Sequence, residues 1–256
     1  MTRLTLERLG GMEVPLGTAW LLADCTEARG KQDLWVRQKP AMLDVLREQA
    51  MVQSVESSNR IEGVTIPADR LRPVVLGRAK PRDRSEEELA GYRKALDWIF
   101  RRGAQTAVAP EIILRLHALA QGGFSGDAGK WKERDNEIIE FSESGESRVR
   151  FRPTPAREVP GAIGDMCRRF QTETSDQTAP PLLVLATFVF DFLCVHPFRD
   201  GNGRVSRLLT TLLLQQQGFI VPRFVSLERL VEENKARYYE VLGECSQGWH
   251  QGRNEI

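Results

Sequence analysis

Twelve consecutive residues, from His196 to Arg207, combine side chains that suit an anion-binding site with a base beside it. The segment Gly201–Gly203 lets the backbone turn tightly and directs several N–H groups at one point, which forms a nest for an anion. Arg204 and Arg207 follow on one face of the next expected helix, where two cations at the positive end of the helix dipole repel each other. An anion between them would remove this repulsion, and a di- or triphosphate fits such a site best. His196 would then act as a base beside the bound phosphates.

Asp200 lies in the same loop and is a candidate metal ligand, because Mg²⁺ beside phosphates keeps several waters and needs few protein carboxylates. Each residue type also has a plainer role. A histidine after an apolar helix usually caps or packs, a Gly-Asn-Gly segment is usually a turn, and arginines three residues apart usually face solvent. Their combination within twelve residues favours the functional interpretation. The phosphate loop G-x-x-x-x-G-K-[ST] does not occur in the chain.

The loop matches the pattern H-x-F-x-[DE]-G-N-G-R-x-x-R at every defining position and so resembles the signature of the Fic family. The resemblance extends from about Trp20 to Trp249. It implies an all-α fold, a Fic-type helical bundle with one small β-hairpin flap. It also implies an enzyme that transfers AMP from ATP to a Ser, Thr or Tyr hydroxyl of a target protein and releases pyrophosphate. ATP is then the co-substrate, and Mg²⁺ is the metal.

The resemblance assigns a role to each residue of the loop. His196 would be the general base, and Asp200 would hold Mg²⁺ between the α- and β-phosphates. Arg204 would stabilise the β-phosphate, and Arg207 would bind the γ-phosphate. The expected ATP-binding residues are Asp200, Gly201, Asn202, Gly203, Arg204, Arg207, Glu137, Ile138, Tyr238 and Tyr239. For Tyr238, plain packing on the apolar stripe of its helix stays an alternative.

A second motif lies in the N-terminal part of the chain. The segment Ser58–Gly63 resembles the inhibitory motif of the family, [ST]-x-x-x-E-[GN]. Glu62 falls in the last turn of its expected helix, where a carboxylate meets the negative end of the dipole. By resemblance Glu62 pairs with Arg207 and excludes the γ-phosphate, with Ser58 as part of the same motif. A solvated glutamate before a helix-ending glycine is the plainer interpretation.

Two other functions stay open beside AMP transfer. In some relatives the same glutamate orients a water that removes AMP from the modified target, so Glu62 also allows de-AMPylation. A nucleotide-sensing regulator without turnover is the alternative from a different class, and the intact His196 favours an enzyme.

The stretch 137–152 differs from the rest, because its second half alternates with period two and its opposite charges suit pairing across strands. We expect a two-stranded hairpin, which the resemblance identifies as the flap. A protein target would dock there as an added strand. The stretch departs from the family pattern at Asn136, where an apolar residue is usual, and at Ile139, where glycine is usual. Ser246 stands where some relatives use asparagine.

Helical periodicity dominates elsewhere in the chain. The capping box Ser85-x-x-Glu88 is expected to begin one helix, and Ser226 to cap one long last helix with Leu227 to Leu242 as its stripe. The other expected helices span 40–62, 110–121, 157–172, 181–195 and 204–217, with that of Ser85 spanning 85–100. We divide the chain into an N-terminal helical segment, 1–84, carrying the inhibitory motif, and a Fic core, 85–256.

Composition limits the class of protein. The 256 residues carry a formal net charge of +1, which argues against a nucleic-acid binder. The four cysteines form no C-x-x-C pair and the three histidines lack zinc-site spacing. The chain opens no signal peptide, and its longest apolar run, 180–195, is too short for a bilayer, so we expect a cytoplasmic protein without membrane contact. Self-modification and a homo-oligomer stay open.

Overall fold

Helices form most of the protein, as the all-α prediction requires. The computed structural model describes residues 4–38, 40–123, 125–141, 145–177 and 179–254. The longer elements, in chain order, are α1 (Leu16–Gln38), α2 (Pro40–Ile61), α3 (Ala68–Val75), α4 (Arg84–Arg102), α5 (Pro110–Gln121), β1 (Ile138–Phe141), β2 (Ser147–Phe151), α6 (Val159–Asp176), α7 (Pro181–Val195), α8 (Asn202–Gln216), α9 (Leu227–Glu233) and α10 (Lys235–Cys245). The predicted bundle with one two-stranded hairpin is confirmed.

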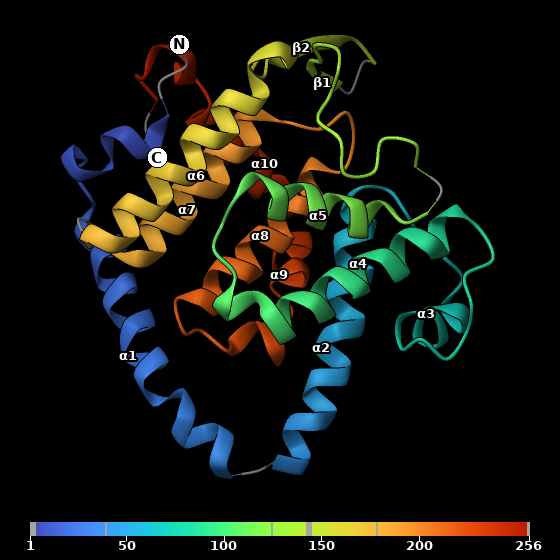
Figure 1. Ribbon diagram of the computed structural model, residues 1–256. Helices are drawn as coiled ribbons and strands as arrows, with labels where there is room; N and C mark the ends of the chain where they lie inside the picture. The colour runs from blue at the N-terminus through green and yellow to red at the C-terminus, as the bar shows by residue number, and fades with distance from the viewer. Residues whose placement is uncertain (1–3, 39, 124, 142–144, 178, 255–256) are drawn as a thin grey trace.

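The apolar helix α7 and the helix that follows it, α8, form the centre of the core. α7 packs against α6 and α8, and α8 also contacts α4 and α5. Phe188 and Phe192 of α7 and Leu208 and Leu212 of α8 are fully buried. Burying each such side chain contributes about 1.5–3 kcal/mol, which is enough to hold the loop between the two helices in one place. The helices α1 and α2 form a V that opens upward in the view, with α8 and α9 between them and α3 beyond α2 (Figure 1).

The two ends of the described chain meet on α7. The carboxylate of Asp191 accepts hydrogen bonds from the backbone N–H groups of Thr5 and Leu6 at 2.9 and 3.0 Å, and from the indole N–H of Trp249 at 2.8 Å. Burial raises the pKa of this carboxyl group even though three donors surround it. A polar residue in an otherwise apolar helix thus fastens segments that are more than 240 residues apart.

The start of α4 differs from the prediction. Asp83 is the N-cap, since its carboxylate accepts from the backbone N–H of Glu86 at 2.9 Å, and the helix begins at Arg84. The prediction of a capping box at Ser85 is therefore wrong. Glu88, the residue expected to complete it, instead points to Arg204 at 2.6 Å. The buried ion pair takes the carboxylate that the capping box would have used.

The C-terminal helix also differs. Ser226 caps α9 as predicted, with its hydroxyl accepting from the N–H of Arg229 at 3.0 Å. The prediction of a single long helix is wrong, because the helix is interrupted at Asn234 and divides into α9 and α10. The side-chain amide of Asn234 donates to the carbonyl of Leu230 at 2.9 Å, a local bond that competes with helix continuation. The division of the chain after residue 84 stays a prediction.

The hairpin of β1 and β2 is antiparallel, with Ile139 opposite Val149 and Glu140 opposite Arg148. The Glu140–Arg148 pair lies 2.8 Å apart and supplies the cross-strand charge pairing expected from the sequence. Arg150 donates to the backbone carbonyl of Tyr239 and so ties the hairpin to α10. In the part of the chain that the structure describes, no helix combines the length and apolar character needed to cross a membrane.

Candidate active site

His196 ends α7 in the left-handed region, with φ 49° and ψ 62°, so the imidazole leaves the helix at a sharp corner. Its Nδ1 lies 3.3 Å from the carbonyl of Leu193. Because a carbonyl oxygen only accepts, this contact places the proton of the neutral ring on Nδ1 and leaves Nε2 as a free acceptor. Burial lowers the pKa of His196 to about 4, with the charge of Lys132 acting in the same direction. The ring is therefore neutral near pH 7.

Asn202 holds the turn that follows. Its side-chain oxygen accepts from the backbone N–H of Phe198 at 2.9 Å, and its amide donates to the carbonyl of the same residue at 2.8 Å. The residue is 2% exposed and begins α8. Both polar atoms of this side chain thus serve the loop itself. Gly201 supplies the positive φ of 82° that the turn requires before the helix.

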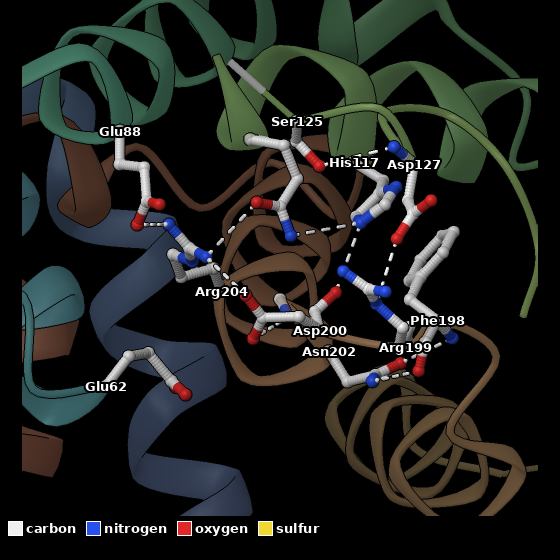
Figure 2. Close-up of polar contacts among 12 residues, drawn as sticks. Glu62, Glu88, His117, Ser125, Asp127, Phe198, Arg199, Asp200, Asn202 and Arg204 are labelled. Carbon is white, nitrogen blue, oxygen red and sulfur yellow. Dashed lines mark hydrogen bonds and ion pairs between the residues drawn. The ribbon is translucent and has the colours of Figure 1, made fainter. Parts of the chain in front are cut away.

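His117 of α5 supports the loop. The ring of His117 stacks on Phe198 with centroids 3.7 Å apart and planes 9° from parallel. Its Nδ1 accepts from the N–H of Gly129 at 3.0 Å, so its Nε2 carries the proton and donates to the carbonyl of Asp200 at 3.1 Å (Figure 2). Burial lowers the pKa of His117 to about 4. Our sequence analysis missed this residue, although a histidine on the apolar stripe of the 110–121 helix was a signal for it.

Arg204 is buried beneath the loop and faces Glu88 of α4. The two side chains are 2% and 4% exposed, with 2.6 Å between Nη1 and the carboxylate. Nη2 lies 3.4 Å from the amide oxygen of Gln121 and 3.5 Å from the carboxylate of Asp200 (Figure 2). The anion that compensates Arg204 is therefore a side chain 116 residues away, which the local pattern did not reveal.

Arg207, one turn further along α8, is surrounded by the end of α2. Its Nε donates to the hydroxyl of Ser58 at 2.9 Å, and its Nη2 donates to the Ser58 carbonyl at 2.9 Å and to Glu62 Oε1 at 2.7 Å. Glu62 approaches so closely that its Oε1 leaves no room for a Cβ on Gly203. The carboxylate thus occupies the N-terminal end of α8, where the helix dipole and the arginine favour an anion.

The remaining predicted residues lie around this centre. Tyr238 and Tyr239 stand edge to face with their rings 5.5 Å apart, and burial raises the pKa of both phenols. Tyr238 and Arg207 line the same cavity of about 280 Å³ between α7, α8, α9 and α10. Glu137 pairs with Arg152 at 3.0 Å on the hairpin, and Ile138 begins β1.

Lys132 is a further residue that our sequence analysis missed. It is 6% exposed, its Nζ donates to Asn136 at 2.7 Å, and its backbone N–H donates to the carbonyl of Pro197 at 2.9 Å. Burial lowers the pKa of this ammonium group to about 8. Asn136 also donates to the carbonyl of Phe198 at 3.4 Å, so the segment before β1 is bonded directly to the loop. The polar residue that departs from the family pattern has a structural use here.

The residues fit a single magnesium ion of the kind that phosphates bring with them. The side chain of Asp200 is 57% exposed, so its carboxylate is accessible from solvent. In the described ranges, no group of three or more His, Cys, Asp or Glu side chains is arranged to hold a metal ion. One accessible carboxylate beside an anion site is the donor set that Mg²⁺ uses when phosphate oxygens and waters supply the rest.

Comparison with known proteins gives a consistent result. Residues 107–214 match the Fic/DOC family. The chain is 25% identical over 144 residues to a probable protein adenylyltransferase of Aquifex aeolicus, covering 56% of this chain and 39% of the relative. It is 25% identical over 226 residues to the protein adenylyltransferase Fic of Drosophila erecta, covering 83% and 41%. The chain thus spans about two fifths of the length of these curated relatives.

The fold is also similar to that of solved Fic structures. A crystal structure of a Fic family protein from Desulfovibrio desulfuricans superimposes with a TM-score of 0.77 at 21% identity, covering 93% of this chain and 69% of that chain. A second crystal structure, of a Fic domain containing signaling protein from Bacteroides thetaiotaomicron, gives 0.69 at 20% identity, covering 82% and 76%.

Proposed function

We propose that this chain, whose residues 107–214 match the Fic/DOC family, transfers AMP from ATP to a Ser, Thr or Tyr hydroxyl of a protein target, releasing pyrophosphate. The observation that carries the proposal is the position of His196. A neutral imidazole with a free Nε2 ends α7 directly before the helix N-terminus that would bind the phosphates. The names of the relatives, protein adenylyltransferases, support the same reaction.

In the proposed reaction, Nε2 of His196 takes the proton of the target hydroxyl as its oxygen forms a bond to the α-phosphorus. The bond between the α-phosphorus and the bridging oxygen breaks, and pyrophosphate leaves with the electron pair. Arg207 binds the γ-phosphate, and Asp200 would hold Mg²⁺, which neutralises phosphate charge when bound. Arg204, fixed by Glu88, supports Asp200 and places positive charge beneath the phosphates.

We propose that Glu62 restrains this reaction. In the structure its carboxylate bonds to Arg207 and lies against Gly203, the place proposed for the γ-phosphate. A bound triphosphate must displace it, because two anions cannot share one arginine and one helix end at low cost. Glu62 is 26% exposed at its side chain, so water can solvate the displaced carboxylate.

We also propose that the target lies along the hairpin of β1 and β2 as an added strand, which brings a hydroxyl to His196. The bond from Arg150 to the carbonyl of Tyr239 supports this, since it holds the hairpin beside the predicted adenosine residues.

Incubation with Mg²⁺ and either α-labelled or γ-labelled ATP tests the reaction. A generic protein mixture serves as acceptor beside the enzyme itself. Label transferred to protein from the α position alone supports AMP transfer. Label transferred from the γ position identifies a phosphotransferase and refutes the proposal.

The variant His196→Ala separates chemistry from binding. Loss of a general base lowers such rates by about 10²- to 10⁴-fold, so labelling should nearly disappear. Binding of ATP, followed by its effect on the melting temperature, should remain. Unchanged labelling in this variant would show that another group is the base.

A further inference from the structure

Helix α1 lies at the edge of the molecule (Figure 1) and carries several exposed large apolar side chains. Trp20 is 69% exposed and Trp35 is 70% exposed, and Leu21 and Leu34 are also exposed. Leaving these large apolar side chains in water is costly, and exposed apolar side chains at both ends of one helix make it a candidate interaction surface.

The opposite face of α1 is firmly attached to the bundle. Arg29 donates to the carbonyl of Gln217 at 3.1 Å and lies over the ring of Phe219 at 5.5 Å. The side-chain oxygen of Gln32 accepts from the N–H of Ile220 at 2.9 Å. The helix is therefore held by one side, and on its exposed side Asp24, Lys31 and Trp35 line an open groove that α1 forms with residues 220–225.

On the exposed side, residues at positions mirrored about the middle of the helix are alike or opposite in charge. About the midpoint between Glu27 and Ala28, Trp20 mirrors Trp35, Leu21 mirrors Leu34, and the acidic Asp24 mirrors the basic Lys31. At about 100° per residue, Trp20, Asp24, Lys31 and Trp35 lie on one face of the helix. All four of these residues are exposed.

Two helices packed antiparallel about a twofold axis bring each residue to its mirror position on the other copy, and here the residues at mirror positions are complementary. Two α1 helices packed antiparallel would place Trp20 against Trp35 of the other copy, and Leu21 against Leu34. Asp24 would meet Lys31, and every contact would occur twice. A foreign helix would need no such symmetry.

We propose that α1 pairs with α1 of a second copy of this chain, antiparallel about a twofold axis near Glu27 and Ala28. The four tryptophans would bury roughly 400–700 Å², a large part of the about 1,200 Å² at which specific interfaces begin. A groove of about 550 Å³ beside this face adds contact area, since it is lined by Val221 and Val225, both of them exposed.

Sedimentation equilibrium with the full chain tests the pairing. The mass expected at micromolar concentration is twice 29.0 kDa. The double variant Trp20→Glu/Trp35→Glu should give the mass of one chain. Leu230→Glu is the matched control, because Leu230 is 50% exposed on α9, away from α1, and its substitution should leave the dimer intact.

A charge exchange separates pairing with a second copy from pairing with another protein. Asp24→Lys alone and Lys31→Asp alone should each weaken the dimer by about tenfold or more, since like charges then meet twice. Asp24→Lys/Lys31→Asp together should restore it. Circular dichroism confirms that each variant stays helical. A wild-type chain that is monomeric at about 100 µM, a mass above two copies, or failure of the exchange to restore pairing would overturn the proposal.

Discussion

Arg204 and Arg207 leave the same end of α8, and each meets a glutamate from another helix, yet the two pairs differ in burial. The Arg204–Glu88 pair is 2% and 4% exposed, whereas the partner of Arg207, Glu62, is 26% exposed. Glu88 projects from the first turns of a long helix in the core, and Glu62 follows the last turn of α2. The carboxylate of Glu88 is almost closed off from water, whereas the carboxylate of Glu62 can reach water when it is displaced.

The difference separates a structural pair from an exchangeable one. Removing one partner of a fully buried ion pair leaves an uncompensated charge, which strongly destabilises the fold. A partly exposed carboxylate can leave its arginine for solvent when a better anion arrives. The same helix end therefore contains a permanent ion pair and a replaceable ion pair three residues apart.

The largest effect is expected from Glu88→Gln, which leaves the buried Arg204 charge with only the more distant carboxylate of Asp200, 3.5 Å away. We expect a loss of about 3–5 kcal/mol in the free energy of unfolding, measured by urea denaturation. The matched variant Glu62→Gln should cost about 1 kcal/mol, because Arg207 keeps its two bonds to Ser58. Equal losses for the two variants would contradict the comparison.

A smaller effect is expected from Glu62→Gly, which should raise activity. A charge-assisted hydrogen bond contributes about 1.5–3 kcal/mol, so its removal should raise labelling from α-labelled ATP by roughly 10- to 100-fold. The variant Glu48→Gln on the same helix is the control, since Glu48 pairs with Arg72 and Arg78 away from the site. Equal labelling by wild type and Glu62→Gly would show that Glu62 does not restrain the reaction.

Acid should lower the free energy of unfolding through His117, whose ring bonds to the carbonyl of Asp200 in the loop that also contains Arg204. Its pKa is about 4 when folded and near 6.5 when unfolded, so the unfolded state binds the proton first as pH falls. Stability is full above about pH 6.5 and declines toward pH 4, by about 2 kcal/mol at pH 5.

The variant His117→Gln removes the titrating group. Its free energy of unfolding should change less between pH 7 and pH 5 than that of the wild type, as urea denaturation at the two pH values would show. An unchanged pH dependence would exclude His117 as the cause.

Sequence reasoning succeeded where the signal was local. The loop from His196 to Arg207, the helix before it and the hairpin near 137–152 are each contained in a short stretch, and periodicity identifies such elements. It failed for α1, because the apolar side chains of that helix face solvent and give no stripe toward the core. It also failed at Ser85 and Asn234, where one contact with a distant or neighbouring residue decided where a helix began or broke.

The sequence by itself determined the chemistry available to this protein. It placed a base, a carboxylate, an anion nest and two arginines within twelve residues, and spacing along the chain is sufficient for that. The motif at Ser58–Gly63 predicted Glu62 as the partner of Arg207, but only the tertiary structure revealed Glu88 as the partner of Arg204 and how deeply each pair is buried. Glu88 and Glu62 lie 116 and 145 residues from their partners, and nothing in local spacing distinguishes the buried one from the exposed one. Burial sets whether an ion pair can open, and burial is a property of the packed bundle.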